Sequence, residues 1–286
     1  MPVRQPGGHS NGPRPNQRSG HRRQFDQRTN EYHTSRAHNL GGDQVEGHRA
    51  VYELLKANRR KVQTIYFEEG IDRSGIVKQI ADFAFNHRVP IQSISSSRFS
   101  HIAGSELHQG VVAVAAPIRA LDLEEIVASN SKAANLLVLD HITDPRNLGA
   151  ILRSAECAGV TGVIIPEHRA CRLTPSATKT AAGAIEYLSF SLASSIPGAL
   201  SDLKALGVWS VGLDMDAEAN LSQINLLTSP VALVLGAEGK GLSKLTKARC
   251  DLLAKIPQFG RVESLNVSAA ATLAVYEVAR ARGTLI

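Results

Sequence analysis

The sequence predicts an α/β protein of two domains, the second built on a mostly parallel sheet with helices on both faces. Three observations lead to this prediction. Apolar runs of strand length alternate with helical periodicity through residues 135–286. A shorter alternation of the same kind occupies residues 45–118, and 286 residues suffice for two modest domains. From Val231 onward, two apolar strands each end in a loop rich in Gly and small polar residues.

The composition limits which partners, metal sites and cellular locations are expected for this protein. Hydrophobic residues make up 43% of the chain and the net charge is +6, which suits either an anionic partner or simple solubility. Cys157, Cys171 and Cys250 are scattered without a C-x-x-C pair, so neither a zinc site nor a disulfide framework is expected. No apolar run is long enough to span a membrane, and no signal-peptide core is visible. We therefore expect a cytoplasmic protein without a bound metal.

Residues 1–44 are expected to be a disordered basic tail. This segment has almost no aliphatic residues, so it buries too little apolar surface to offset its chain entropy. It holds seven arginines and no lysine against three acidic residues, a net charge of +4. Arginine suits phosphate recognition and base stacking, which favours a loose RNA-binding arm. A passive solubilising tail fits the same composition.

The first domain, residues 45–118, reads as a small α/β sandwich. Its polar clusters at Glu46–Arg49 and His108–Gly110 suit caps and turns, or contacts to RNA. An acidic, mainly helical linker follows over residues 119–134. Periodicity predicts helices at 45–57, 71–87 and 98–103, and strands at 62–67, 89–94 and 110–115.

The second domain, residues 135–286, alternates buried strands and helices. Gly159 and Gly207 are expected to end two of its helices. The predicted strands are 135–140, 162–165, 188–192, 208–213, 231–235 and a last one at 252–256, and the predicted helices are 150–158, 174–182, 196–206 and 267–279.

Several common site motifs are absent from the sequence. No G-x-G-x-x-G follows the first strand of the second domain, which argues against a dinucleotide site. The loop Gly236–Leu242 resembles a phosphate loop, but Leu242 stands where that motif needs lysine. Neither a serine nucleophile elbow nor a cluster of metal ligands is seen.

Three loops after three strands carry a family resemblance. They read DPRNLGAILR, LGAEGKGL and FGRVESLNVSAA, and their order resembles the SpoU branch of the SPOUT RNA methyltransferases. That resemblance implies transfer of a methyl group from S-adenosylmethionine to a ribose 2′-hydroxyl, by a domain whose C-terminal part forms a trefoil knot. The EGHRAV and HQGVVA segments make the first domain similar to the RNA-binding domain of the 23S rRNA guanosine-2′-O-methyltransferase subgroup.

The resemblance implies a catalytic set of Asn147, Arg153, Glu238, Ser264 and Asn266. Asn147 is expected just before a helix and Arg153 within its first turns. A guanidinium with a pKa above about 12 is a poor base, so Arg153 either activates the ribose hydroxyl or stabilises the developing alkoxide. Each residue also has an ordinary interpretation: a surface salt bridge for Arg153, a solvated loop position for Glu238, and helix capping for Ser264 and Asn266.

The resemblance further implies that main-chain groups around Gly236, Ile256 and Leu265 bind S-adenosylmethionine, and that no metal is needed. It also implies a homodimer formed through the last helix, 268–282, although an ordinary core helix would have the same sequence pattern. The expected substrate is rRNA. A tRNA ribose methyltransferase and a non-catalytic RNA-binding assembly factor are the alternatives.

Overall fold

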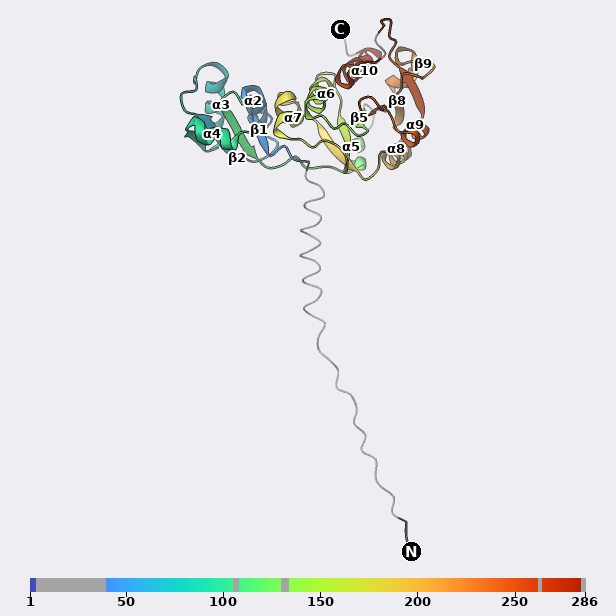
Figure 1. Ribbon diagram of the computed structural model, residues 1–286, viewed down its shortest axis with the longest axis horizontal. Helices are drawn as coiled ribbons and strands as arrows, with labels where there is room; N and C mark the ends of the chain where they lie inside the picture. Colours follow the sequence, from blue (N-terminus) through green and yellow to red (C-terminus); the bar gives the residue numbers. More distant parts are fainter. Residues whose placement is uncertain (4–39, 105–107, 130–133, 262–263, 284–286) are drawn as a thin grey trace. The chain divides into compact units, whose positions relative to one another are not determined.

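The computed structural model describes residues 1–3, 40–104, 108–129, 134–261 and 264–283. The predicted disordered tail lies almost entirely outside these residues. The described chain forms two sheets, one of four strands and one of seven, each with helices packed against it (Figure 1). The α/β prediction with two sheet-based parts is therefore confirmed.

The N-terminal sheet has the strand order β1-β4-β2-β3, with β4 antiparallel to both β1 and β2, and β3 parallel to β2. One face packs Val51, Leu54 and Ile80 from two helices, and Phe99 from a third helix packs on the other face. The elements are β1 (Gln44–Glu46), α2 (His48–Ala57), β2 (Val62–Glu68), α3 (Gly75–Asn86), β3 (Ile91–Ile94), α4 (Ser96–Ile102) and β4 (Val111–Ala115).

Two helix starts differ from the prediction. Val45 lies in strand β1 rather than in a helix, because Gly47 at φ 89° turns the chain before α2 begins at His48. Helix α3 begins at Gly75 instead of Ile71. The Asp72 side chain accepts hydrogen bonds from the Ser74 amide and hydroxyl, which holds that segment in a turn.

The C-terminal sheet is parallel throughout, with the strand order β7-β6-β5-β10-β8-β11-β9. Helices α6, α7 and α10 cover one face, and α5 and α8 cover the other. The elements are α5 (Leu123–Ala128), β5 (Asn135–Leu139), α6 (Pro145–Cys157), β6 (Gly162–Pro166), α7 (Pro175–Thr180), η1 (Ala184–Glu186), β7 (Ser189–Ala193), α8 (Ile196–Ala205), β8 (Trp209–Leu213), β9 (Ala219–Asn220), η2 (Leu221–Gln223), η3 (Asn225–Thr228), β10 (Val231–Leu235), α9 (Lys244–Arg249), β11 (Leu252–Lys255) and α10 (Val267–Ala281).

Three details of this domain depart from the prediction. Helix α6 begins at Pro145, not Ala150, because Asp144 caps it and proline suits the first helical position. Strand β11 is only partly buried, with Leu252 exposed, since its outer neighbour β9 has two residues. Helix α9 and strand β9 were not predicted. The implied knot stays a prediction.

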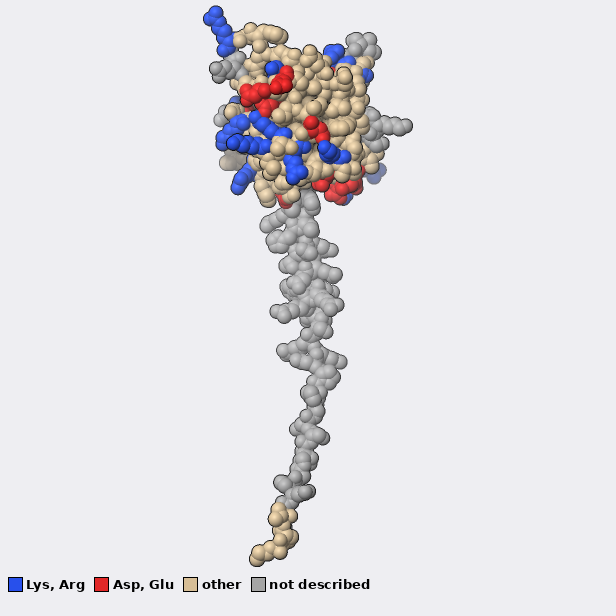
Figure 2. All heavy atoms as spheres, turned by 90° about the vertical axis from the view of Figure 1, so that its right-hand side faces the viewer, with Lys and Arg blue, Asp and Glu red and all other residues tan. Residues whose placement is uncertain are grey.

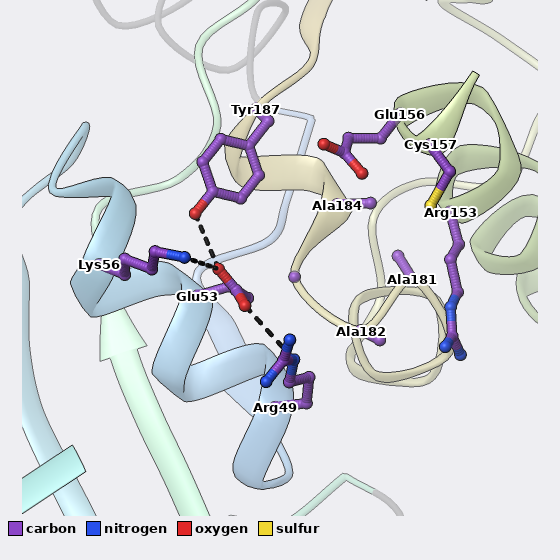
Figure 3. Close-up of a pocket in the computed structure, with 11 residues that line it drawn as sticks. Arg49, Glu53, Lys56, Arg153, Glu156, Cys157, Ala181, Ala182, Ala184 and Tyr187 are labelled. Carbon is purple, nitrogen blue, oxygen red and sulfur yellow. Dashed lines mark hydrogen bonds and ion pairs between the residues drawn. The ribbon is translucent and has the colours of Figure 1, made fainter. Parts of the chain in front are cut away.

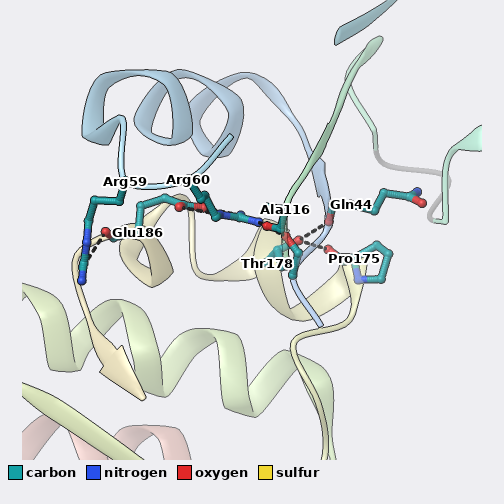
Figure 4. Close-up of polar contacts among 8 residues, drawn as sticks. Gln44, Arg59, Arg60, Ala116, Pro175, Thr178 and Glu186 are labelled. Atoms are coloured by element: carbon teal, nitrogen blue, oxygen red, sulfur yellow. Dashed lines mark hydrogen bonds and ion pairs between the residues drawn. The ribbon is translucent and has the colours of Figure 1, made fainter. Parts of the chain in front are cut away.

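The two sheets are joined by a buried polar contact (Figure 4). Arg60, just after α2, donates to both carboxylate oxygens of Glu186 at 2.9 and 2.6 Å. The same guanidinium donates to the main-chain oxygens of Gly42 and Ala116, and Arg59 donates to the Glu186 carbonyl at 2.9 Å. These bonds attach the N-terminal domain to the segment between α7 and β7.

Candidate functional site

The strand order brings the first two predicted loops together. Strand β10 pairs with β5 along its whole length, although the strands lie far apart in sequence. At the carboxyl edge of this pair, the Asp140 amide donates to the Leu235 carbonyl at 2.7 Å. The loops after two adjacent parallel strands therefore start side by side, at the sheet edge where α/β proteins bind ligands.

Asn147 connects all three predicted loops. Its amide nitrogen donates to the Glu238 carboxylate and, at 3.2 Å, to Asp144. Its side-chain oxygen accepts from the Asn266 amide nitrogen at 3.2 Å. Asn147 lies inside the first turn of α6, so the prediction that it precedes the helix is wrong; Asp144 is the cap. The contact with Glu238 joins the loop after β10 to the loop after β5.

Asn266 has a second role as the cap of α10. Its side-chain oxygen accepts from the Ser268 amide at 2.8 Å and from the Ser268 hydroxyl at 2.6 Å. The capping prediction for Asn266 is thus correct, and it does not exclude the contact with Asn147. The helix start and the third loop are fixed by the same side chain.

A cavity of about 680 Å³ opens beside this cluster. Its lining includes Gly236, Ile256 and Leu265, the three positions predicted to surround the methyl donor. A Cβ on Gly236 would overlap the main chain of Gly241, so only glycine fits where this loop folds back on itself. Glu238, Ser264 and Asn266 also line the cavity.

The cavity wall contains an ion pair that the sequence analysis missed. Lys247 of α9 pairs with Asp214, which follows β8, and the Asp216 amide donates to Asp214 at 3.1 Å. Burial acts to raise the pKa of Asp214, but the Lys247 and Asp216 hydrogen bonds outweigh it and hold the pKa below its ordinary value. No motif marks this pair, because its partners come from separate elements.

Arg153 does not line this cavity. It lies six residues after Asn147 on α6, which places it about 240° further round the helix axis at about 100° per residue, and Arg153 is exposed. It lines a cavity of about 420 Å³ together with Arg49, Glu53 and Tyr187 (Figure 3). It also borders a hollow of about 380 Å³ with Tyr276 of α10. Within one chain, the structure separates Arg153 from the rest of the predicted set.

The described residues include neither a group of metal ligands nor a membrane-spanning helix. None of their groups of His, Cys, Asp and Glu could hold a metal ion. No described helix has the length and apolar character needed to cross a membrane.

Lys and Arg side chains gather on the face of the C-terminal domain seen in Figure 2. Helix α9, which lies next to β8 in Figure 1, carries three basic residues: Lys244, Lys247 and Arg249.

Comparison with known proteins assigns this arrangement to a family. Residues 134–276 match the model of the SpoU rRNA methylase family. The chain belongs to the SpoU rRNA methylase family. Residues 44–121 match the model described as RNA 2′-O ribose methyltransferase substrate binding. The predicted family and its enzyme class, an RNA methyltransferase, are therefore confirmed.

Individual relatives cover nearly the whole folded chain. The chain is 37% identical over 244 residues to the 23S rRNA (guanosine-2′-O-)-methyltransferase RlmB of Pseudomonas putida, covering 84% of this chain and 97% of the relative. It is 39% identical to RlmB of Coxiella burnetii, covering 83% and 95% of the two chains. The crystal structure of the SpoU methyltransferase AviRb from Streptomyces viridochromogenes, in complex with AdoMet, superposes with a TM-score of 0.71 at 25% identity, covering 84% of this chain and 90% of that one.

Proposed function

We propose that this SpoU methylase transfers a methyl group from S-adenosylmethionine to the ribose 2′-hydroxyl of a guanosine in 23S rRNA. The observation that carries the proposal is the junction of Asn147, Glu238 and Asn266 beside the 680 Å³ cavity, which Glu238 and Asn266 line. The choice of substrate rests on the RlmB relatives, which are named for this activity.

The residues around the large cavity suit S-adenosylmethionine. Leu213, Ile256 and Leu265 supply apolar surface for an adenine ring, and the loop from Gly236 to Leu242 supplies main-chain polar groups. The carboxylates of Asp214 and Glu238 suit the positive sulfonium and ammonium groups. When bound, this donor supplies an activated methyl group, so the protein's main task is alignment.

Asn147 and Asn266 act as positioning residues in this proposal. They hold the loops after β5, β10 and β11 in a fixed relation, which places Ser264 beside the cavity. The Ser264 hydroxyl is positioned to contact the ribose. Fixing the acceptor against the donor turns a reaction between two molecules into one within a single complex, which lowers its entropic barrier.

We infer that the working form is a homodimer, because Arg153 lies outside the donor cavity of its own chain. A second copy would bring its Arg153 to that cavity. The surface next to Arg153 suits such a contact: Leu273 and Tyr276 of α10 are 50% and 38% exposed there. At the composite site, Arg153 would stabilise the alkoxide that forms as the hydroxyl loses its proton.

The N-terminal domain and the basic tail would capture the RNA. The tail's net charge of +4 suits phosphate contacts of low specificity. An enzyme that acts on rRNA is expected in the cytoplasm, in agreement with the isolated cysteines, which are all free in the structure.

A transfer assay with Arg153→Ala tests this function. Labelled S-adenosylmethionine is incubated with unmodified 23S rRNA, or with tRNA, and label in the RNA is counted. We expect transfer to 23S rRNA that falls by about 100-fold or more in Arg153→Ala, as when a group that stabilises transition-state charge is removed. RNA affinity should fall only a few-fold. Near-normal turnover by the variant would refute the role of Arg153, and transfer to tRNA alone would refute the substrate.

A further inference from the structure

The 420 Å³ cavity lies between the two domains and is distinct from the donor cavity. Helix α2 of the N-terminal domain contributes Arg49, Glu53 and Lys56 to its walls. Helix α6 of the C-terminal domain contributes Arg153 and Glu156, and the segment 181–187 closes it (Figure 3). RNA held by the N-terminal domain can therefore meet Arg153 in this cavity.

The two walls are held at a fixed separation. The buried Arg60–Glu186 pair bonds the N-terminal domain directly to the segment that closes the cavity. Gly183, at φ 94°, packs so closely on α2 that a Cβ there would overlap the Glu53 side chain. The cavity is thus built before RNA arrives, which reduces the ordering cost of binding.

Tyr187 presents a fixed aromatic surface to this cavity. Its hydroxyl donates to Glu53 at 2.8 Å, while the ring is part of a side chain 42% exposed. Glu53 is held in turn by Arg49 at 3.3 Å and Lys56 at 3.9 Å. Burial, with the hydrogen bond to Glu53, raises the pKa of Tyr187 to about 12, so the ring stays neutral. A neutral, anchored ring is a stacking platform for a nucleobase.

Glu156 offers a carboxylate to the same cavity. Among the described residues, no ion pair engages it. It stands three residues after Arg153, so the two side chains leave α6 on one face with Cβ atoms about 5–6 Å apart. In Figure 3 the Glu156 carboxylate lies on the side of the cavity where the Tyr187 ring stands, and the guanidinium groups of Arg49 and Arg153 lie on the other.

This arrangement suits one nucleoside with a guanine base. Guanine presents two neighbouring donors, N1–H and N2–H, that a carboxylate accepts together. Adenine and cytosine present an acceptor at the corresponding ring nitrogen, and uracil has one donor between two acceptors, so each would face the carboxylate less favourably. A base edge at Glu156 places the attached ribose toward Arg153, on the same helix face.

We propose that the interdomain cavity binds the base of the target nucleotide, with Tyr187 stacking on guanine and Glu156 selecting it by accepting N1–H and N2–H. Arg49 and Lys56 then meet the adjoining phosphates. This inference rests on the proposed function, since it identifies the nucleoside whose ribose Arg153 contacts. It adds a guanine-selecting subsite to which both domains contribute.

The first test replaces the methylated guanosine of the RNA substrate by inosine, which lacks the 2-amino group. We expect the single-turnover rate of the wild-type protein to fall about 10-fold, as for loss of one hydrogen bond to a charged group. In Glu156→Gln the guanosine rate should fall to near the inosine rate, erasing the preference. Glu124→Gln, an exposed glutamate outside the cavity, is the matched control and should keep the wild-type preference. Unchanged selectivity in Glu156→Gln would overturn the proposal.

A second test does not depend on methyl transfer. Saturation-transfer NMR would compare binding of guanosine 5′-monophosphate and adenosine 5′-monophosphate to the full chain. We expect the wild-type protein to favour the guanine nucleotide, Glu156→Gln to lose that preference, and Tyr187→Leu to weaken both ligands while Tyr187→Phe retains them. If both nucleotides bind alike to the wild-type protein, the subsite is refuted. A guanine preference without any transfer to RNA would support the subsite and refute the proposed function.

Discussion

Arg60 and Glu186, which come from different domains, form a bidentate ion pair with side chains 8% and 1% exposed. The other terminal nitrogen of the Arg60 guanidinium donates to the main-chain oxygens of Gly42 and Ala116. A buried charge pair is tolerated when its hydrogen bonds are satisfied in this way. The pair fixes how the substrate-binding domain meets the methyltransferase domain, and it shapes the cavity that Arg153 lines.

Removing one member of this pair should destabilise the protein strongly. In Arg60→Ala the Glu186 carboxylate stays buried without its partner, which costs about 3–5 kcal/mol. The free energy of unfolding would be measured by urea titration. The double variant Arg60→Met, Glu186→Leu should lose less than Arg60→Ala, because no charge stays buried. Arg280→Ala, which breaks the exposed pair with Glu277, is the control and should leave the unfolding midpoint nearly unchanged.

Gly236→Ala should strongly weaken donor binding. Its Cβ would overlap the main chain of Gly241, so the loop from Gly236 to Leu242 must open and deform the donor cavity. We expect the dissociation constant for S-adenosylmethionine, measured by calorimetry, to rise at least about 10-fold, equivalent to 1.4 kcal/mol. Gly260→Ala is the control, because a Cβ there meets nothing within 4 Å. Equal affinity of both variants would show that this loop does not shape the donor site.

Asp251 should make stability depend on pH in the acid range. It accepts from Lys204 at 2.7 Å and from the Ser210 amide and hydroxyl at 2.9 and 2.8 Å. Burial acts to raise its pKa, but these bonds dominate and lower it below the ordinary 3.8. The stabilisation is therefore fully present above pH 3.8 and is lost as the pH falls from there toward the folded-state pKa.

The variant Asp251→Asn measures that contribution. At pH 7 its free energy of unfolding should lie about 1–3 kcal/mol below that of the wild type, as expected when charged hydrogen bonds are lost. The difference should persist at pH 5 and shrink at pH 3. A difference that grows as the solution becomes more acidic would contradict the assignment.

The composite site of the proposed dimer predicts rescue between two inactive variants. Arg153→Ala retains its donor loop, and Gly236→Ala retains its Arg153. In a mixed dimer, the donor loop of the first chain meets the arginine of the second, so one of two sites is intact. Purified mixed dimers should show about half the wild-type activity, whereas each variant alone shows almost none. Absence of rescue would mean that each chain uses its own Arg153.

Local patterns predicted most strands and helices, since periodicity and flanking glycines are local signals. They failed where a side chain or a glycine outweighed periodicity, as with Gly47 before α2 and the Asp144 cap that draws Asn147 into α6. The convergence of Asn147, Glu238 and Asn266 depends on β10 lying beside β5, which spacing alone does not reveal. It was expected only through the family resemblance.

Long-range contacts had no signal in the sequence. Arg60 and Glu186 are 126 residues apart, and Asp214 meets Lys247 through tertiary packing. The separation of Arg153 from Asn147 was missed because the predicted helix began after Asn147. With both residues in α6, a spacing of six places their side chains on different faces. The resemblance grouped Arg153 with the donor loops, and the fold shows that one chain does not bring them together.

The most direct test of the central claim identifies the modified nucleoside. The protein is incubated with S-adenosylmethionine carrying a deuterated methyl group and with 23S rRNA that lacks ribose methylation. The RNA is then digested to nucleosides for mass spectrometry. The proposed function predicts deuterated 2′-O-methylguanosine. Label on a base, on another ribose, or absent from the RNA although the donor binds would contradict it.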